Sequence, residues 1–153
     1  MICLCEVLDP VKYHLKSKVA ILESKHASLA AFGLRDEKWL HMWDIDTRLL
    51  TLFYQSLDRE YDWFIVVYDY PEFCSDREIK EAIIWHEIGH IDHPVLSNSV
   101  QLECEIQCDE LAKQNGYGSG MKCVLDLTLK MAHSLNHPLL THMTTVRKIR
   151  LTS

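Results

Sequence analysis

Five consecutive residues carry the strongest chemical signal in the sequence, His86-Glu87-Ile88-Gly89-His90. Histidines four positions apart lie on one face of a helix and can chelate a single metal ion. Imidazole nitrogens suit zinc, and a site with three protein ligands leaves one position for water. Glu87 lies beside that face and can act as the general base toward a zinc-activated water. The segment therefore predicts a catalytic zinc site, the alternative being a histidine pair on a helix surface.

A catalytic zinc site needs a third protein ligand, and Glu105 is the leading candidate. Glu105 and Asp109 are four residues apart in the next expected helix, so they share one of its faces. One carboxylate can bind zinc, while the other accepts the N–H of a ligand imidazole and fixes its tautomer. We expect Glu105 to be the ligand and Asp109 to orient a histidine. The alternative is that both are solvent-exposed carboxylates.

Three other residues compete for the third position. His93 would share the face of the histidine pair if the helix continued, but Pro94 indicates that the helix has ended. Glu103 would point away from the expected metal-binding face. Cys108 could supply a thiolate, although small cysteines often only pack. Whether His93 replaces Glu105 stays open.

The elements that would position these residues are clearest in the C-terminal half. Residues 62–70 form an aromatic and β-branched run that Pro71 ends, which predicts a strand. Ser75-Asp76-Arg77-Glu78 has the form of a capping box, and apolar residues at helical spacing follow it to about residue 92. Further helices are expected over about 99–114, 119–135 and 145–151, the first closed by Asn115-Gly116.

The N-terminal part is harder to interpret. Residues 10–32 have roughly helical spacing and end at Gly33, a residue typical of helix C-caps, so we expect a helix there. Residues 39–45 could form a strand, and residues 48–57 either a strand or a helix. Residues 1–153 are expected to form a single α+β domain, with a small sheet and a mostly helical C-terminal half.

The motif residues resemble the gluzincin metallopeptidases, especially the HtpX and CAAX-prenyl-protease type. That type carries H-E-x-x-H and, downstream, E-x-x-A-D-x-x-A, which match His86 to His90 and Glu105-x-x-Cys108-Asp109-x-x-Ala112. The likeness covers about residues 62–151. ImmA/IrrE-like regulatory proteases, small soluble proteins with a similar helix, are the second comparison.

The end of the chain is also similar to this family. Residues 141–149 are similar to its closing T-H-P-x-T-x-x-R-I segment, with Met143 in place of Pro and Lys148 in place of Arg. His142, His137 and Tyr117 are candidates for the contact to the oxyanion or the substrate. The membrane-spanning helices of many relatives are absent from the sequence.

The resemblance implies a zincin-like domain that hydrolyses peptide bonds in a protein or peptide substrate. Zinc would be bound by His86, His90 and Glu105, with Glu87 as general base and Asp109 orienting a ligand histidine. An edge strand preceding the active-site helix would pair with an extended peptide. A zinc-binding regulatory protein with little or no activity is the alternative, and a hydrolase of another substrate, such as nucleic acid, is a third reading.

Composition and charge narrow the classes of partner. A net charge of −6 argues against a nucleic-acid binder, and we interpret the basic residues Arg147, Lys148 and Arg150 as a solvated face. The sequence has no apolar run long enough to span a bilayer and does not begin like a signal peptide. The six cysteines form no C-x-x-C pair, so reduced thiols in a cytoplasmic protein are expected.

Overall fold

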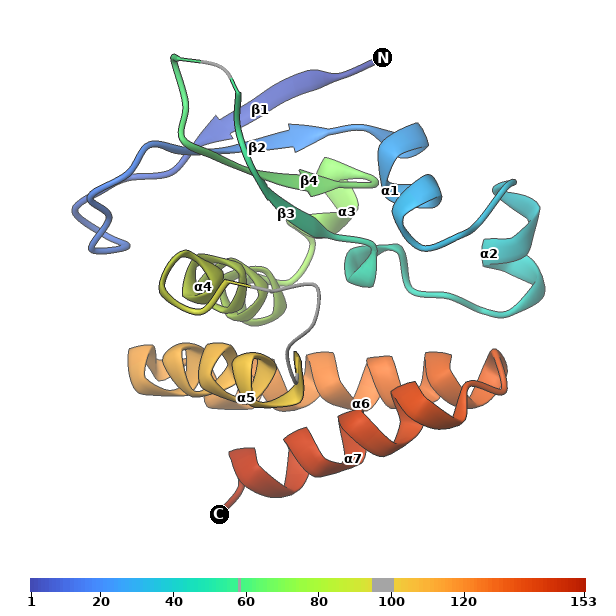
Figure 1. The fold of residues 1–153 in the computed structure, drawn as a ribbon. Helices are drawn as coiled ribbons and strands as arrows, with labels where there is room; N and C mark the ends of the chain where they lie inside the picture. The colour runs from blue at the N-terminus through green and yellow to red at the C-terminus, as the bar shows by residue number, and fades with distance from the viewer. Residues whose placement is uncertain (58, 95–100) are drawn as a thin grey trace.

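Four strands form a mixed sheet in the order β1-β2-β4-β3, seen at the top of Figure 1. The computed structural model describes residues 1–57, 59–94 and 101–153. Strands β2 and β4 run parallel, whereas β1 and β3 pair antiparallel with them at the two edges. The strands are β1 (Cys3–Val7), β2 (Val19–Glu23), β3 (Leu52–Gln55) and β4 (Trp63–Val67).

The strand expected over residues 62–70 is present as β4, but it is an inner strand and not the edge strand before the active-site helix. It pairs with β2 on one side and β3 on the other, so a peptide cannot pair with it. The continuous apolar run reflects burial in the middle of the sheet. Strand β3 is the edge strand next to β4, and it follows a short 3-10 turn, η1 (Thr47–Leu49).

Helix α4 (Arg77–Asp92) lies between the sheet and the three helices that follow it in the chain (Figure 1). Asp76 caps it, because its side chain accepts a hydrogen bond from the backbone N–H of Ile79; Ser75 does not fill this role. Ten of its residues are buried, including Glu81, whose carboxylate accepts hydrogen bonds from Tyr13 and Lys12. A helix enclosed in this way is buried on several faces, as its apolar content predicts.

Three helices form the layer beneath α4: α5 (Gln101–Ala112), α6 (Gly118–Ser134) and α7 (Pro138–Leu151). A π-helical turn, η2 (Lys113–Tyr117), joins α5 to α6, and Gly116 adopts a left-handed backbone there. Helix α7 is longer than the last helix expected from the sequence. Residues 99 and 100 of the expected second helix lie outside the described residues.

Two close approaches hold α4 against its neighbours. A Cβ atom on Gly89 would lie 2.9 Å from Sγ of Cys108 in α5. A Cβ atom on Gly120 of α6 would lie 2.2 Å from the backbone oxygen of Glu78. Both glycines therefore let helix backbones approach more closely than any side chain would permit.

The single helix expected over residues 10–32 is wrong. Its first part forms turns, its middle is the buried strand β2, and only its end is helical, as α1 (Lys25–Ala31). The strand suggested over residues 39–45 is likewise wrong, since α2 (Lys38–Met42) begins there. A four-residue helix, α3 (Tyr70–Phe73), connects β4 to α4.

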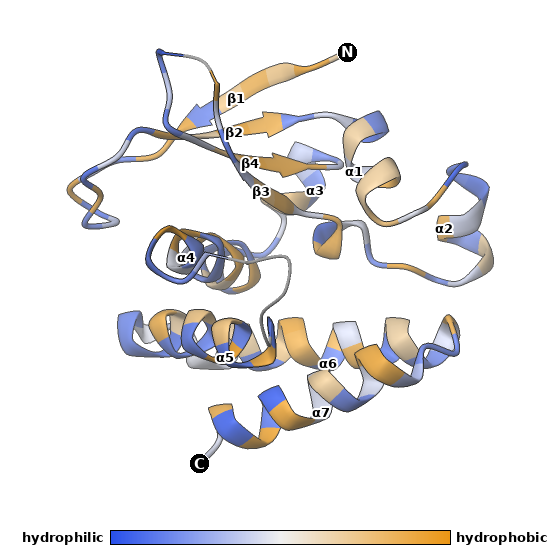
Figure 2. Cartoon of the chain, in the orientation of Figure 1, coloured by the Kyte–Doolittle hydropathy of each residue, from blue (hydrophilic) through white to orange (hydrophobic). Residues whose placement is uncertain are grey.

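The core lies between the sheet and the helices. Hydrophobic residues predominate on β2 and β4 and on parts of α4 and α6 (Figure 2). The coarse expectation of an α+β chain with a small sheet and a helical C-terminal half is confirmed. Within the described ranges, no helix combines the length and apolar character needed to cross a membrane.

Candidate metal centre

Helix α4 presents His86 and His90 toward α5, one turn apart. Both imidazoles are buried, and their ring centroids lie 5.2 Å apart. The spacing of four residues places them on one face of the helix. The contact between Gly89 and Cys108 brings α5 close to this face.

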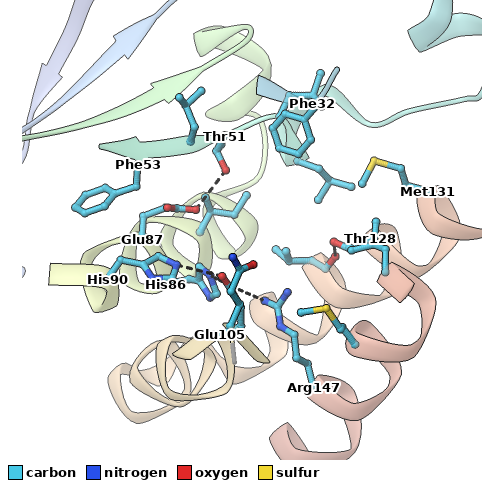
Figure 3. Close-up of a pocket in the computed structure, with 18 of the residues that line it drawn as sticks. Phe32, Thr51, Phe53, His86, Glu87, His90, Glu105, Thr128, Met131 and Arg147 are labelled. Carbon is cyan, nitrogen blue, oxygen red and sulfur yellow. Dashed lines mark hydrogen bonds and ion pairs between the residues drawn. The ribbon is translucent and has the colours of Figure 1, made fainter. Parts of the chain in front are cut away.

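The carboxylate of Glu105 faces both imidazoles (Figure 3). Its Oε2 atom lies 2.8 Å from Nε2 of His86, and its Oε1 atom lies 3.5 Å from Nε2 of His90. Two imidazole nitrogens and one carboxylate thus meet at one place, as the sequence predicts for Glu105. This is a donor set that suits zinc.

The other ring nitrogens are held by hydrogen bonds. Nδ1 of His86 lies 2.8 Å from Oδ1 of Asp109, and Nδ1 of His90 lies 3.1 Å from the backbone oxygen of His93. Both acceptors are oxygens, so we assign the proton to Nδ1 in each ring. This arrangement fixes the ring orientations and leaves each Nε2 as the atom that can bind a metal.

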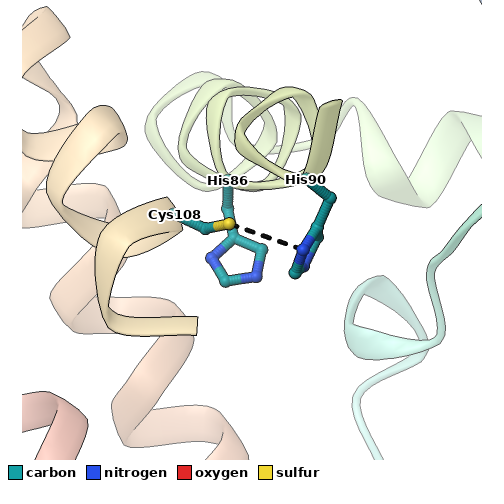
Figure 4. Close-up of side chains that lie close together, drawn as sticks. All are labelled: His86, His90 and Cys108. Atoms are coloured by element: carbon teal, nitrogen blue, oxygen red, sulfur yellow. Dashed lines mark hydrogen bonds between the residues drawn. The ribbon is translucent and has the colours of Figure 1, made fainter. Parts of the chain in front are cut away.

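A second group of potential ligand atoms lies on the same face of α4. His86, His90 and Cys108 have ligand atoms within 4.8 Å of one another and could hold a metal ion (Figure 4). The Sγ atom of Cys108 lies 3.5 Å from Nδ1 of His90, the nitrogen opposite the one that faces Glu105. Burial raises the pKa of the Cys108 thiol, which disfavours the thiolate that a metal needs.

We favour Glu105 over Cys108 as the third ligand because of access. Glu105 lines the cavity that both histidines also line, whereas Cys108 is fully buried and is not part of the described cavity wall. Cys108 packs against Gly89 instead.

Arg147 of α7 completes the site, and the sequence interpretation missed it. Its guanidinium donates to both oxygens of Asp109, over 2.9 Å from Nε and 2.7 Å from an Nη atom, and lies 3.9 Å from Glu105. Only 13% of its side chain is exposed, so its assignment to a solvated face is wrong. The closing segment of the family that the sequence resembles has an arginine at the position of Lys148. That arginine lies one residue from Arg147 and could have pointed to it.

The charges of the site are mutually dependent. Burial lowers the pKa of His86, but the carboxylates of Asp109 and Glu105 outweigh this effect and raise the pKa to about 10. Burial raises the pKa of Glu105 and Asp109, yet bonds from the histidines and Arg147 bring both pKa values below their usual range. The two carboxylates are therefore anionic, and the His86 ring is protonated until a metal replaces the Nε2 proton.

Glu87 lies in the same cavity, on the side toward β3. Its Oε1 atom accepts a long hydrogen bond of 3.5 Å from the hydroxyl of Thr51. Burial raises the pKa of the Glu87 carboxyl. A carboxylate with a raised pKa is a better proton acceptor near neutral pH.

The other candidates lie elsewhere. The side chains of His93 and Glu103 are exposed, and Glu103 lies 3.6 Å from Arg150. His142 is exposed on α7, and neither it nor Tyr117 is among the described residues that line the cavity. His137 does line the cavity and also caps α7, accepting from the backbone N–H of Leu140.

The cavity itself has a volume of about 790 Å³. Its walls come from β3 and η1 on one side and from α4, α5, α6 and α7 on the other. This size is typical of a site for a small-molecule ligand. No known family model matches the chain, and no curated protein or solved structure is detectably similar to it.

Proposed function

We propose that the chain is a zinc metallopeptidase of the gluzincin type, resembling the HtpX and CAAX-prenyl-protease group. One observation carries the proposal: the Glu105 carboxylate lies against Nε2 of both His86 and His90, with Glu87 in the same cavity. A purely structural metal site has no use for a half-buried carboxylate that faces the cavity beside the ligands.

His86, His90 and Glu105 would hold the zinc, and Asp109 would keep His86 in the tautomer that binds it. When bound, zinc supplies a Lewis acid that polarises a carbonyl and lowers the pKa of water. These three residues come from two helices that pack at close range, which supports a donor set that needs little rearrangement to bind the metal.

Glu87 would transfer the protons. It would accept a proton from the attacking water and deliver it to the amine that leaves when the peptide bond breaks. Its place in the cavity beside the histidines allows both transfers from one side chain. The raised pKa of Glu87 suits this alternation.

Strand β3 would align the substrate. It is the last strand of the sheet order, and its residues Leu52 to Gln55 line the cavity. An extended peptide that pairs with β3 would run past Glu87. Backbone pairing binds peptides of many sequences, so the specificity must come from the cavity.

Glu87→Gln tests the proposal. The variant keeps the size of the side chain but cannot accept a proton, so turnover should fall by a factor of about 10² to 10⁴. It should keep about one zinc per chain, because Glu87 is not a ligand. A lysate of the cells that naturally produce the protein is incubated with wild type or variant, and the peptide fragments are compared by mass spectrometry. Metal analysis of both proteins measures the zinc content.

Glu78→Gln is the matched control, since Glu78 is exposed near the start of the same helix. It should retain wild-type cleavage. Fragments that appear equally with wild type and Glu87→Gln would contradict the general-base role. Zinc in both proteins with no fragments from either would favour the alternative, a zinc-binding regulatory protein.

A further inference from the structure

The cavity is much larger than the metal-binding groups require. Helix α7 lines the cavity with Arg147, Met143 and Leu140, among others. Each of these residues lies about one helical turn farther from the metal-binding groups than the one before it. The seven residue steps from Arg147 to Leu140 span roughly 10 Å along a helix axis. Helix α6 lines the same length with Val124, Thr128 and Met131 among others.

This extension is apolar. We call it the apolar chamber, and define it by six of its residues: Phe32, Leu49, Val124, Met131, Leu140 and Met143. Figure 3 shows Phe32, Thr128 and Met131 on the side of the cavity away from His90 and Phe53.

The polar side chains of the chamber are engaged in local bonds. The hydroxyl of Thr128 donates to the backbone oxygen of Val124 over 2.8 Å, and Nδ1 of His137 accepts from Leu140. Among the described residues that line the cavity, Glu87, Glu105 and Arg147 are the only Asp, Glu, Lys or Arg side chains, and all belong to the site. A charged group in the chamber would therefore be desolvated without a partner.

We propose that the apolar chamber receives a large uncharged apolar side chain of the peptide substrate, next to the bond that is cleaved. The inference rests on the proposed peptidase function and adds the class of substrate. The chamber and the wall formed by Glu105 and Arg147 belong to one cavity, in which Met143 of the chamber lies one helical turn from Arg147. A side chain that enters the chamber would therefore place its own backbone beside the metal site. Methionines in the wall can adapt to aliphatic and aromatic shapes alike.

Hydroxamates of single amino acids test the proposal without turnover. They chelate zinc through the hydroxamate and present one side chain to the cavity. Calorimetry on zinc-loaded protein should show leucine hydroxamate binding at least about tenfold more tightly than glycine hydroxamate. Lysine hydroxamate, which is long but charged, should bind no more tightly than the glycine compound. Equal affinities for the glycine and leucine compounds would overturn the inference.

Thr128→Phe locates the effect, because a ring at this position takes up space in the chamber that a substrate side chain would need. It should abolish the advantage of leucine hydroxamate and leave the affinity for glycine hydroxamate unchanged. Thr145→Phe is the matched control: Thr145 is exposed on α7, and its hydroxyl also donates to a backbone oxygen four residues earlier. A leucine preference that survives Thr128→Phe would contradict the assignment to the chamber.

The two proposals fail in different ways. Zinc-loaded wild type that binds glycine hydroxamate without preferring leucine contradicts only the chamber. If the zinc-loaded wild-type protein binds no hydroxamate, the proposed zinc peptidase site is contradicted. The proposed substrate class is then contradicted as well. Should Thr128→Phe not fold, the ranking of the three compounds on wild type still decides the question.

Discussion

Asp109 accepts hydrogen bonds from two sides, from the ring of His86 and from the guanidinium of Arg147. Its side chain is almost fully buried, and a buried carboxylate is tolerated only when it is paired. Arg147 thus has an indirect role: it keeps Asp109 anionic and oriented, and Asp109 in turn orients His86. Through this chain of contacts, helix α7 acts on the candidate metal site, whose proposed ligands belong to α4 and α5.

Arg147→Met should therefore both destabilise the protein and weaken zinc binding. Removing one partner of a buried pair costs about 3–5 kcal/mol of the free energy of unfolding. Loss of an orienting partner typically reduces metal affinity about 10- to 100-fold. Urea unfolding and zinc titration measure the two effects. Arg150→Met is the control, since Arg150 is 49% exposed and should change the free energy of unfolding by less than about 1 kcal/mol. Unchanged zinc affinity in Arg147→Met would contradict the positioning role.

Zinc affinity should also depend on pH. In the metal-free protein the carboxylates of Asp109 and Glu105 overcome the effect of burial and raise the pKa of His86 to about 10, so its ring is protonated at neutral pH. Zinc bound at the proposed site would displace this proton from His86, so its affinity should rise with pH and fall as pH decreases. One displaced proton corresponds to about a tenfold change per pH unit. Competition titrations between pH 6 and 8 measure the slope, and a flat profile would contradict the coupling.

At the scale of elements, the sequence predicted those helices whose apolar residues recur at helical spacing within one continuous segment. Helices α4 and α6 lie close to the expected ranges because their apolar spacing and end signals are contained in consecutive residues. The same reasoning placed His86, His90, Glu105 and Asp109 on two facing surfaces, since a helical spacing of four residues fixes a shared face.

Elements defined by distant partners could not be predicted in this way. Strand β2 pairs with β4 in the register Val19 to Trp63, and a run of buried apolar residues reads equally well as a helix until that partner is known. Arg147 meets Asp109 only because α7 folds back beside α5. The apolar chamber likewise needs helices and loops from both halves of the chain.

The approach of α6 to α4 is fixed at Gly120. A Cβ atom there would lie 2.2 Å from the backbone oxygen of Glu78, so Gly120→Ala forces the two helices apart. We expect a loss of about 1–3 kcal/mol or more in the free energy of unfolding. Gly118→Ala on the same helix would meet only the flexible side chain of Lys113, at 3.3 Å, and should be neutral or slightly stabilising. Denaturant unfolding of both variants checks this, and equal stabilities would contradict the packing.

At the scale of the whole molecule, the candidate centre links α4, the helix next to the sheet, to the helical layer below it. The sheet lies on one side of α4, and α5 and α6 lie on the other (Figure 1). The site draws residues from α4, α5 and α7, which are separated along the chain. A metal bound there would cross-link α5 to α4, the helix that packs next to the sheet.

Zinc should therefore stabilise the entire fold. Free zinc at 100 times its dissociation constant adds about 2.7 kcal/mol when it binds only the folded state. For a chain of this size, about 2–4 °C per kcal/mol gives a rise in Tm of roughly 5–11 °C. Hydrogen exchange should slow in α4, α5 and α7 together. His90→Ala, which removes one proposed ligand, should lose most of the shift, and magnesium, which prefers oxygen ligands, should not reproduce it. A Tm that zinc leaves unchanged, or a shift retained in full by His90→Ala, would show that the metal binds elsewhere or not at all.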